Sequence, residues 1–198
     1  MNKKINKRVI KDIINYEKLV YGINSKSIIW GCITNHCTYR IWKWLYYSRK
    51  YDFYSQFYDK GVLWKIVLIY YLRKKNKIAE KIGFDIDTKN IGQGLLIYHI
   101  GATVINSSSI IGENCILHGN NCIGNKGPAG SPCPVIGNNV EIGVGAKIIG
   151  GVTIADNIKI GAGAVVVHSF TEEGITIGGV PARRLISFMC QVSSFNGI

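Results

Sequence analysis

The chain has 198 residues, 47% of them hydrophobic and 18% charged, a globular composition that excludes a largely disordered protein. Its net charge of +12 is unevenly distributed: residues 1–80 hold 17 Lys and Arg against 5 Asp and Glu, whereas residues 81–198 hold 7 of each. Two chemically different parts therefore meet near residue 80.

The first 80 residues are predicted to form basic, aromatic-rich α-helices, chiefly over 39–50 and 61–75. Two interpretations of this region stay open. In one, the helices cap the rest of the protein and their lysines form a solvated face. In the other, Trp42, Trp44, Trp64 and the flanking basic side chains rest on an anionic membrane surface. Nucleic acid is not expected as a partner, because no recognised binding motif accompanies the charge.

Cellular location is inferred from the cysteines and the apolar segments. The six cysteines show no paired Cys-x-x-Cys spacing, and charged residues interrupt any apolar signal core near the N-terminus. The apolar run over 66–72 is too short to span a bilayer. We therefore expect a reduced, cytoplasmic protein without a metal site, which associates with the inner face of the membrane if the second interpretation holds.

A six-residue rhythm runs through residues 84–180. Aliphatic residues recur without a slip at Ile136, Ile142, Ile148, Ile154, Ile160 and Val166. A period of six fits neither an α-helix nor simple strand alternation, but it fits a short strand followed by a turn. Three such units make one triangular coil, in which each inward aliphatic residue stacks on the one 18 positions later. The prediction is a mainly β protein: a parallel β-helix over 81–186, after the α-helical region 1–80 and before a C-terminal tail over 187–198.

The rhythm is interrupted twice. Between Ile97 and Ile111 the register shifts by two, and between Ile123 and Ile136 it shifts again through a Gly- and Pro-rich loop over 124–134. Departures from a rigid repeat are where function tends to lie.

Over residues 84–186 the pattern resembles the hexapeptide-repeat acyltransferases, whose coil is left-handed. The stretch from Phe84 to His99 is similar to the segment of the serine acetyltransferase branch that runs from a catalytic aspartate to a catalytic histidine. The resemblance implies that His99 is the general base and that Asp85 orients it. Asp85 lies one residue closer to His99 than that branch leads us to expect, so Asp87 remains an alternative partner.

His118 is a second candidate for a catalytic residue. It follows Leu117 in a slot that Gly or Ala usually fills, so its imidazole must point outward, about one coil from His99.

The resemblance also implies acetyl-CoA as the cosubstrate. Small residues leave narrow backbone edges for the pantetheine arm, and the terminal Gly-Val-Pro-Ala-Arg-Arg run supplies cations for the phosphates. The residues expected to contact acetyl-CoA are Gly145, Ala146, Lys147, Ala162, Gly163, Pro181, Arg183 and Arg184.

The acceptor is predicted from departures from the serine acetyltransferase pattern. That branch places an Arg-His pair before the proline that restarts the coil, where this chain has Pro132 and Cys133, and an acidic residue before the catalytic histidine, where this chain has Tyr98. Losing these charges disfavours a small zwitterion. We expect direct O-acetylation of a sugar hydroxyl in a surface polysaccharide. The alternatives are a serine O-acetyltransferase of cysteine biosynthesis and a non-catalytic repeat scaffold.

Assembly is expected to be a homotrimer with clefts between neighbouring β-helices, because a solenoid leaves flat faces that favour closed cyclic association. A dimer of trimers, paired through the N-terminal helices, stays open.

Overall fold

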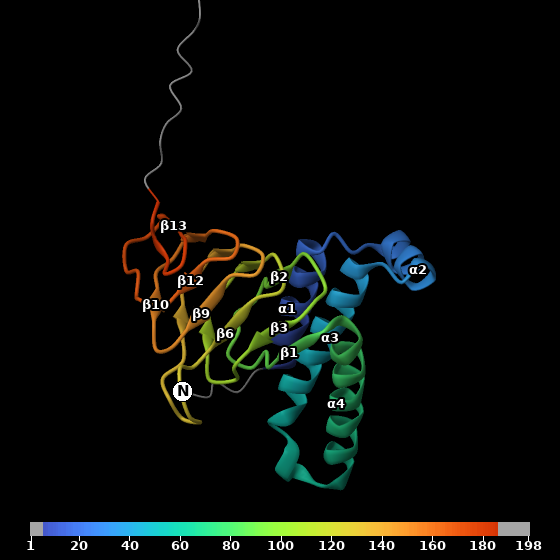
Figure 1. The fold of residues 1–198 in the computed structure, drawn as a ribbon. Helices are drawn as coiled ribbons and strands as arrows, with labels where there is room; N and C mark the ends of the chain where they lie inside the picture. Colours follow the sequence, from blue (N-terminus) through green and yellow to red (C-terminus); the bar gives the residue numbers. More distant parts are fainter. Residues whose placement is uncertain (1–5, 186–198) are drawn as a thin grey trace, which may run out of the picture.

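The computed structural model describes residues 6–185, in which helices pack against one end of a β-helix (Figure 1). The helical elements are α1 (Lys7–Val20), α2 (Ser25–Thr34), α3 (Cys37–Ser55), the short 3₁₀ helix η1 (Tyr58–Lys60) and α4 (Val62–Ile82). The predicted helix 39–50 falls inside α3, and the predicted helix 61–75 falls inside α4 except for Gly61, which is its N-cap residue. Helix α4 ends at Gly83, whose φ of 78° is left-handed, and the first strand begins one residue later. The predicted tail over 187–198 lies outside the described residues.

The rest of the described chain forms short strands arranged in three sheets. Sheet A contains β1 (Phe84–Ile86), β3 (Thr103–Ile105), β6 (Cys122–Gly124), β9 (Lys147–Ile149) and β12 (Val165–Val166). Sheet B contains β4 (Ile110–Ile111), β7 (Val135–Ile136) and β10 (Thr153–Ile154). Sheet C contains β2 (Leu96–Ile97), β5 (Ile116–Leu117), β8 (Glu141–Ile142), β11 (Lys159–Ile160), β13 (Thr176–Gly178) and β14 (Arg183–Arg184). All pairs are parallel except β13 with β14.

The strand register confirms the six-residue rhythm. Ile142 pairs with Ile160, 18 positions later, as three six-residue units per coil require. Leu117 pairs instead with Ile142, because the loop between β6 and β7 adds seven residues to that coil. The loop leaves the coil without disturbing the stack on either side of it.

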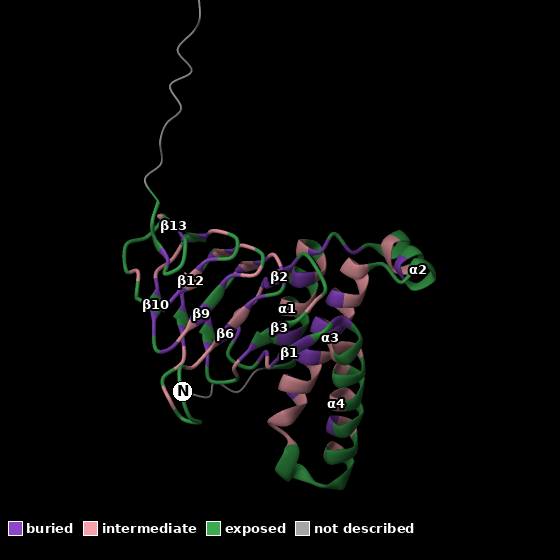
Figure 2. Cartoon of the chain, in the orientation of Figure 1, coloured by how far each residue is buried: buried purple, intermediate pink, exposed green. Residues whose placement is uncertain are grey.

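The inward aliphatic residues form the core of the β-helix, which Figure 2 shows as buried segments repeating along the coils. All six residues of the uninterrupted series are at most 3% exposed: Ile136, Ile142, Ile148, Ile154, Ile160 and Val166. Full burial of one such side chain contributes about 1.5–3 kcal/mol. The stack is therefore the main source of stability in the β-helix.

The helices cover the open end of the first coil. Arg49 of α3 is 6% exposed and donates hydrogen bonds to the backbone carbonyl oxygens of Thr88 (3.2 Å), Ile91 (2.8 Å) and Gly92 (2.6 Å). Its guanidinium also pairs with the buried Glu17 of α1 at 2.7 Å. The bonds to Ile91 and Gly92 satisfy carbonyls at the end of the β-helix, where no further coil follows, whereas the Thr88 carbonyl also accepts from the N–H of Ile91 at 3.1 Å. Burial raises the pKa of Glu17, against the opposing attraction of Arg49.

Candidate active site

His99 lies at the corner where sheet C passes into sheet A, two residues after β2 ends. The corner is tight because Gly101 takes a φ of 149° and Gly119 of the next coil lies against His99. A Cβ at Gly119 would lie 3.0 Å from the carbonyl oxygen of His99, so a larger residue there would press on this backbone. The imidazole is exposed and has no hydrogen-bond partner among the described residues, which leaves both ring nitrogens accessible.

His118 lies beside His99 on the outer face of sheet C, as its sequence slot predicts. Its Nε2 is 2.9 Å from Oε1 of Glu141, and the two side chains are 34% and 37% exposed. The ring of Tyr98 bridges the two histidines, with centroids 5.0 Å from His118 and 6.4 Å from His99. Tyr98, His99, His118 and Glu141 thus form one cluster at the end of sheet C.

Asp85 and Asp87 lie on a different face. Asp85 is exposed on β1 of sheet A and lines a cavity of about 680 Å³ between α4 and that sheet. Asp87 lines the same cavity, and its Oδ1 accepts a hydrogen bond from the backbone N–H of Lys89 at 3.1 Å. Neither carboxylate hydrogen-bonds to His99 within the described chain. Their pairing with His99 stays a prediction.

A narrow glycine edge runs down the same corner from His99. Gly145 and Gly163 have φ values of 71° and 66°, and a Cβ built on either would meet no atom within 4 Å. The coils along this edge are joined by backbone bonds from Gly145 N–H to Gly119 (3.0 Å) and from Gly163 N–H to Val144 (2.8 Å). Such an edge lets an extended chain lie close to the backbone.

The other predicted acetyl-CoA contacts differ in accessibility. Ala162 is exposed beside Gly163, and Lys147 is exposed at the start of β9. Ala146 is 0% exposed and packs in the core, so its methyl group cannot reach a ligand and only its backbone could contribute.

The C-terminal cations also differ. Arg184 forms an ion pair with Glu172 at 2.6 Å, whereas Arg183, also exposed, has no ion-pair partner among the described residues. Pro181 is exposed in the turn that precedes them. Arg183 is therefore the more available cation for a phosphate group.

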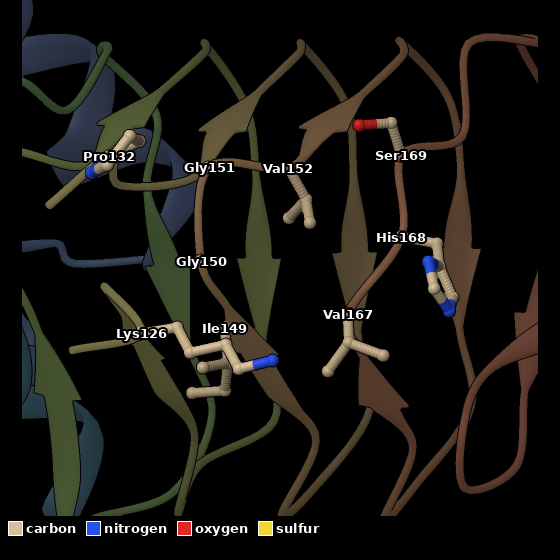
Figure 3. A pocket seen from close by; sticks show the side chains of 9 residues that line it. All are labelled: Lys126, Pro132, Ile149, Gly150, Gly151, Val152, Val167, His168 and Ser169. Carbon is tan, nitrogen blue, oxygen red and sulfur yellow. The ribbon is translucent and has the colours of Figure 1, made fainter.

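The loop over 124–134 covers a second cavity, of about 360 Å³, which Figure 3 shows between the loop and the later coils. Lys126 and Pro132 line it from the loop, and Gly150, Gly151 and His168 line it from the coils. Lys126 is a cation that the sequence reasoning did not select. Its place in the longest Gly- and Pro-rich interruption of the repeat was the signal that could have found it.

The known proteins that are similar to this chain in sequence are acetyltransferases. No family model matches the chain. WcaB of Escherichia coli K12, an acetyltransferase named for colanic acid biosynthesis, is 35% identical over 97 residues, which is 48% of this chain and 60% of that protein. Serine acetyltransferase 1 of Arabidopsis thaliana chloroplasts is 37% identical over 81 residues, 40% of this chain and 26% of that enzyme. The chain thus spans about a quarter to three-fifths of these relatives.

Solved structures match over a longer stretch. Neisseria gonorrhoeae serine acetyltransferase in complex with serine is 26% identical, covering 91% of this chain and 70% of its own, with a TM-score of 0.64. Soybean serine acetyltransferase, at 24% identity, covers 89% of this chain and 69% of its own with a TM-score of 0.68. The chain is thus similar in sequence to these acetyltransferases over part of their length, and it shares the fold of the serine acetyltransferase structures. The fold is therefore the left-handed β-helix preceded by helices that the sequence predicts.

The structure adds Glu141 to the candidate site, through its contact with His118. Nothing local marks this residue, because its contact with His118 depends on how β5 and β8 align across the inserted loop. Among residues 6–185, no group of three or more His, Cys, Asp or Glu side chains is placed to hold a metal ion.

Proposed function

We propose that this protein is an acetyl-CoA-dependent O-acetyltransferase that acetylates a sugar hydroxyl of a surface polysaccharide. One observation carries the proposal: the accessible imidazole of His99 lies next to Tyr98, at the end of the backbone edge formed by Gly119, Gly145 and Gly163. Acetyl-CoA lying along that edge would present its thioester at His99. A similar solved structure, a serine acetyltransferase in complex with CoA, supports acetyl-CoA as the donor.

The proposed reaction is a direct transfer. His99 takes the proton of the acceptor hydroxyl as its oxygen attacks the thioester carbonyl, and the resulting imidazolium returns that proton to the departing CoA sulfur. Arg183 would pair with a phosphate of the cosubstrate, and the backbone at Gly145 and Gly163 would lie along its pantetheine arm.

The orienting role proposed for Asp85, with Asp87 as the alternative, depends on a second copy of the chain. Within one chain these carboxylates lie on sheet A, away from the corner that carries His99. A homotrimer, with sheet A of one copy facing the His99 corner of the next, would supply the missing carboxylate. Sedimentation equilibrium tests this assembly, and a monomer that is fully active would rule out the shared site.

The sugar is favoured over serine because the charged contacts for a zwitterion are missing. The residue before His99 is the exposed Tyr98, and Pro132 and Cys133 stand in the loop without a charge. A carboxylate without its arginine loses its most directional contact. The relative with the larger coverage, WcaB, is named for polysaccharide biosynthesis.

Serine remains the second candidate acceptor, because the similar structures include a serine acetyltransferase bound to serine. A third candidate, a repeat scaffold without activity, would show no binding of CoA.

Thiol release from acetyl-CoA tests all three. The wild type and His99→Ala would be assayed against L-serine and a panel of free and nucleotide-activated sugars. We expect turnover with a sugar, reduced roughly 10²- to 10⁴-fold in His99→Ala. Turnover with serine alone would overturn the sugar assignment, and failure to bind CoA would overturn the enzyme assignment.

The N-terminal helices are proposed to hold the enzyme at an anionic membrane, but not through Trp44, which is 0% exposed and packs in the core against Phe84. No helix of the described residues is long and apolar enough to cross a membrane. The outer face of α4, coloured as exposed in Figure 2, carries Val62, Leu63, Ile66 and Ile69, each more than half exposed. Exposed basic residues continue the same helix: Lys65, Arg73, Lys74 and Lys77. An apolar strip with cations suits an interfacial helix.

Vesicle co-sedimentation tests this attachment. Intact protein should sediment with anionic vesicles, less with neutral ones, and Ile66→Glu with Ile69→Glu should abolish it. Thr153→Glu, on the exposed side of β10, is the matched charge control. If the wild type does not sediment with anionic vesicles, the proposed membrane attachment is wrong. If the wild type is a hexamer and the double variant is not, the apolar face of α4 pairs two trimers instead.

A further inference from the structure

Four side chains form a row on the outer face of sheet C: Tyr98, His118, Glu141 and Lys159 (the sheet C row). The strand register places Tyr98 beside His118, because Ile97 pairs with Leu117, and it pairs Glu141 with Lys159. His118 itself is level with Gly143, and its side chain reaches Glu141 diagonally across the strands. The residues between them along each strand, such as Leu117 and Ile142, are fully buried. Strand alternation therefore turns the row outward as a continuous surface.

The His118–Glu141 contact fixes the imidazole. With Nε2 donating to the carboxylate at 2.9 Å, the neutral ring keeps its lone pair on Nδ1, which can then accept a hydrogen bond from a hydroxyl. The second oxygen of Glu141, Oε2, is 3.9 Å from Nζ of Lys159, too far for a hydrogen bond. That oxygen is open to another hydroxyl, and its charge is balanced by the lysine.

Tyr98 supplies an apolar platform beside these groups. The side chain is 44% exposed, and its ring is tilted by 47° against His118 at 5.0 Å. An exposed aromatic ring next to hydrogen-bonding groups suits a ligand with an apolar face and a hydroxylated edge, which a pyranose ring has. A small amino acid gains little from such a platform.

We propose that the sheet C row is the acceptor subsite and that it binds a saccharide ring stacked on Tyr98, with its hydroxyls held by His118 and Glu141. The inference rests on the proposed function, because the reacting hydroxyl is placed at His99, next in the chain to Tyr98. Glu141 acts through His118 and is a positioning residue. The row is overall neutral when His118 is neutral, which suits an uncharged sugar unit.

The test combines binding with kinetics on the full chain. Saturation-transfer NMR would measure binding of glucose, galactose, N-acetylglucosamine, fucose and L-serine to the wild type, Tyr98→Ala and Glu141→Gln. Glu173→Gln, an exposed carboxylate outside the row, is the matched control. We expect at least one sugar to bind the wild type. Its affinity should fall about tenfold in Tyr98→Ala, fall also in Glu141→Gln, and stay that of the wild type in Glu173→Gln.

The kinetic arm separates positioning from proton transfer. Tyr98→Ala and Glu141→Gln should raise the acceptor KM about tenfold while kcat and its pH profile stay those of the wild type. A fall in kcat with an unchanged KM and a displaced pH profile in Glu141→Gln would overturn the subsite and make the His118 pair the base instead.

The two proposals fail separately. Sugar binding that Tyr98→Ala abolishes, without acetyl transfer to any sugar, would support the subsite and overturn the proposed function. Acetyl transfer to a sugar with wild-type KM in Tyr98→Ala would overturn the subsite alone. Binding of serine but no sugar would overturn both.

Discussion

Replacing Arg49 by methionine should destabilise the protein severely, because this side chain joins the helices to the first coil. The substitution removes the ion pair with Glu17 and three hydrogen bonds to backbone carbonyls of the first coil, of which the Thr88 carbonyl keeps its bond from the N–H of Ile91. Glu17 is 1% exposed, so its charge would stay buried and unpaired. Removing one partner of a buried pair typically costs about 3–5 kcal/mol. That is about a fifth or more of the roughly 5–15 kcal/mol that stabilises a typical domain.

Urea unfolding followed by circular dichroism measures this cost. The control is Lys50→Met, the next residue of α3, whose Nζ lies 5.8 Å from the Tyr46 ring and should matter by about 1 kcal/mol or less. The double variant Glu17→Leu, Arg49→Met should recover much of the loss, because no buried charge remains. A loss in Arg49→Met no larger than in Lys50→Met would refute the capping role.

The same variant should show a characteristic pH dependence. Burial already raises the pKa of Glu17 above 4.5, and without Arg49 nothing comparable opposes it. A raised folded-state pKa means that the folded protein binds the proton more tightly than the unfolded chain. The loss of unfolding free energy in Arg49→Met, relative to the wild type, should therefore be largest at neutral pH and shrink as the pH falls toward 4.5.

Three further predictions concern the β-helix. Burial raises the pKa of the Cys115 thiol to about 11, so in the folded protein at pH 8 a thiol reagent should modify the exposed Cys32 and spare Cys115; equal labelling would contradict this. Ile142→Ala should lower the unfolding free energy by about 2–5 kcal/mol in urea titrations, since its side chain is 0% exposed in the stack. Hydrogen bonds from Asn138 lower the pKa of Asp156, so the stability gap between wild type and Asp156→Ala should be constant above pH 4 and close as the pH falls through that lowered pKa.

The sequence alone determined the β-helix, because its signal is local and repeated. Each coil needs an aliphatic residue at a fixed spacing, and Ile136 through Val166 supply it without a slip. The two interruptions could also be predicted from the sequence. The shift between Ile97 and Ile111 and the loop over 124–134 appear in the structure as coils two and seven residues longer than the regular 18. The outward direction of His118 followed from the same spacing.

Contacts between distant segments were decided only by the tertiary structure. Glu141 reaches His118 because the loop over 124–134 is excluded from the coil and β8 stacks on β5, which no local pattern reveals. Arg49 is one of many cations in the basic N-terminal region and nothing in the sequence singles it out, yet the docking of α3 on the first coil buries it against Glu17 and backbone carbonyls. Asp85 and His99 are near in sequence, but Asp85 lies on sheet A and His99 lies beyond the end of sheet C, because the chain passes sheet B and sheet C between them. A periodic sequence fixes which side of a strand a residue occupies, whereas its neighbours depend on the stacking of coils and helices.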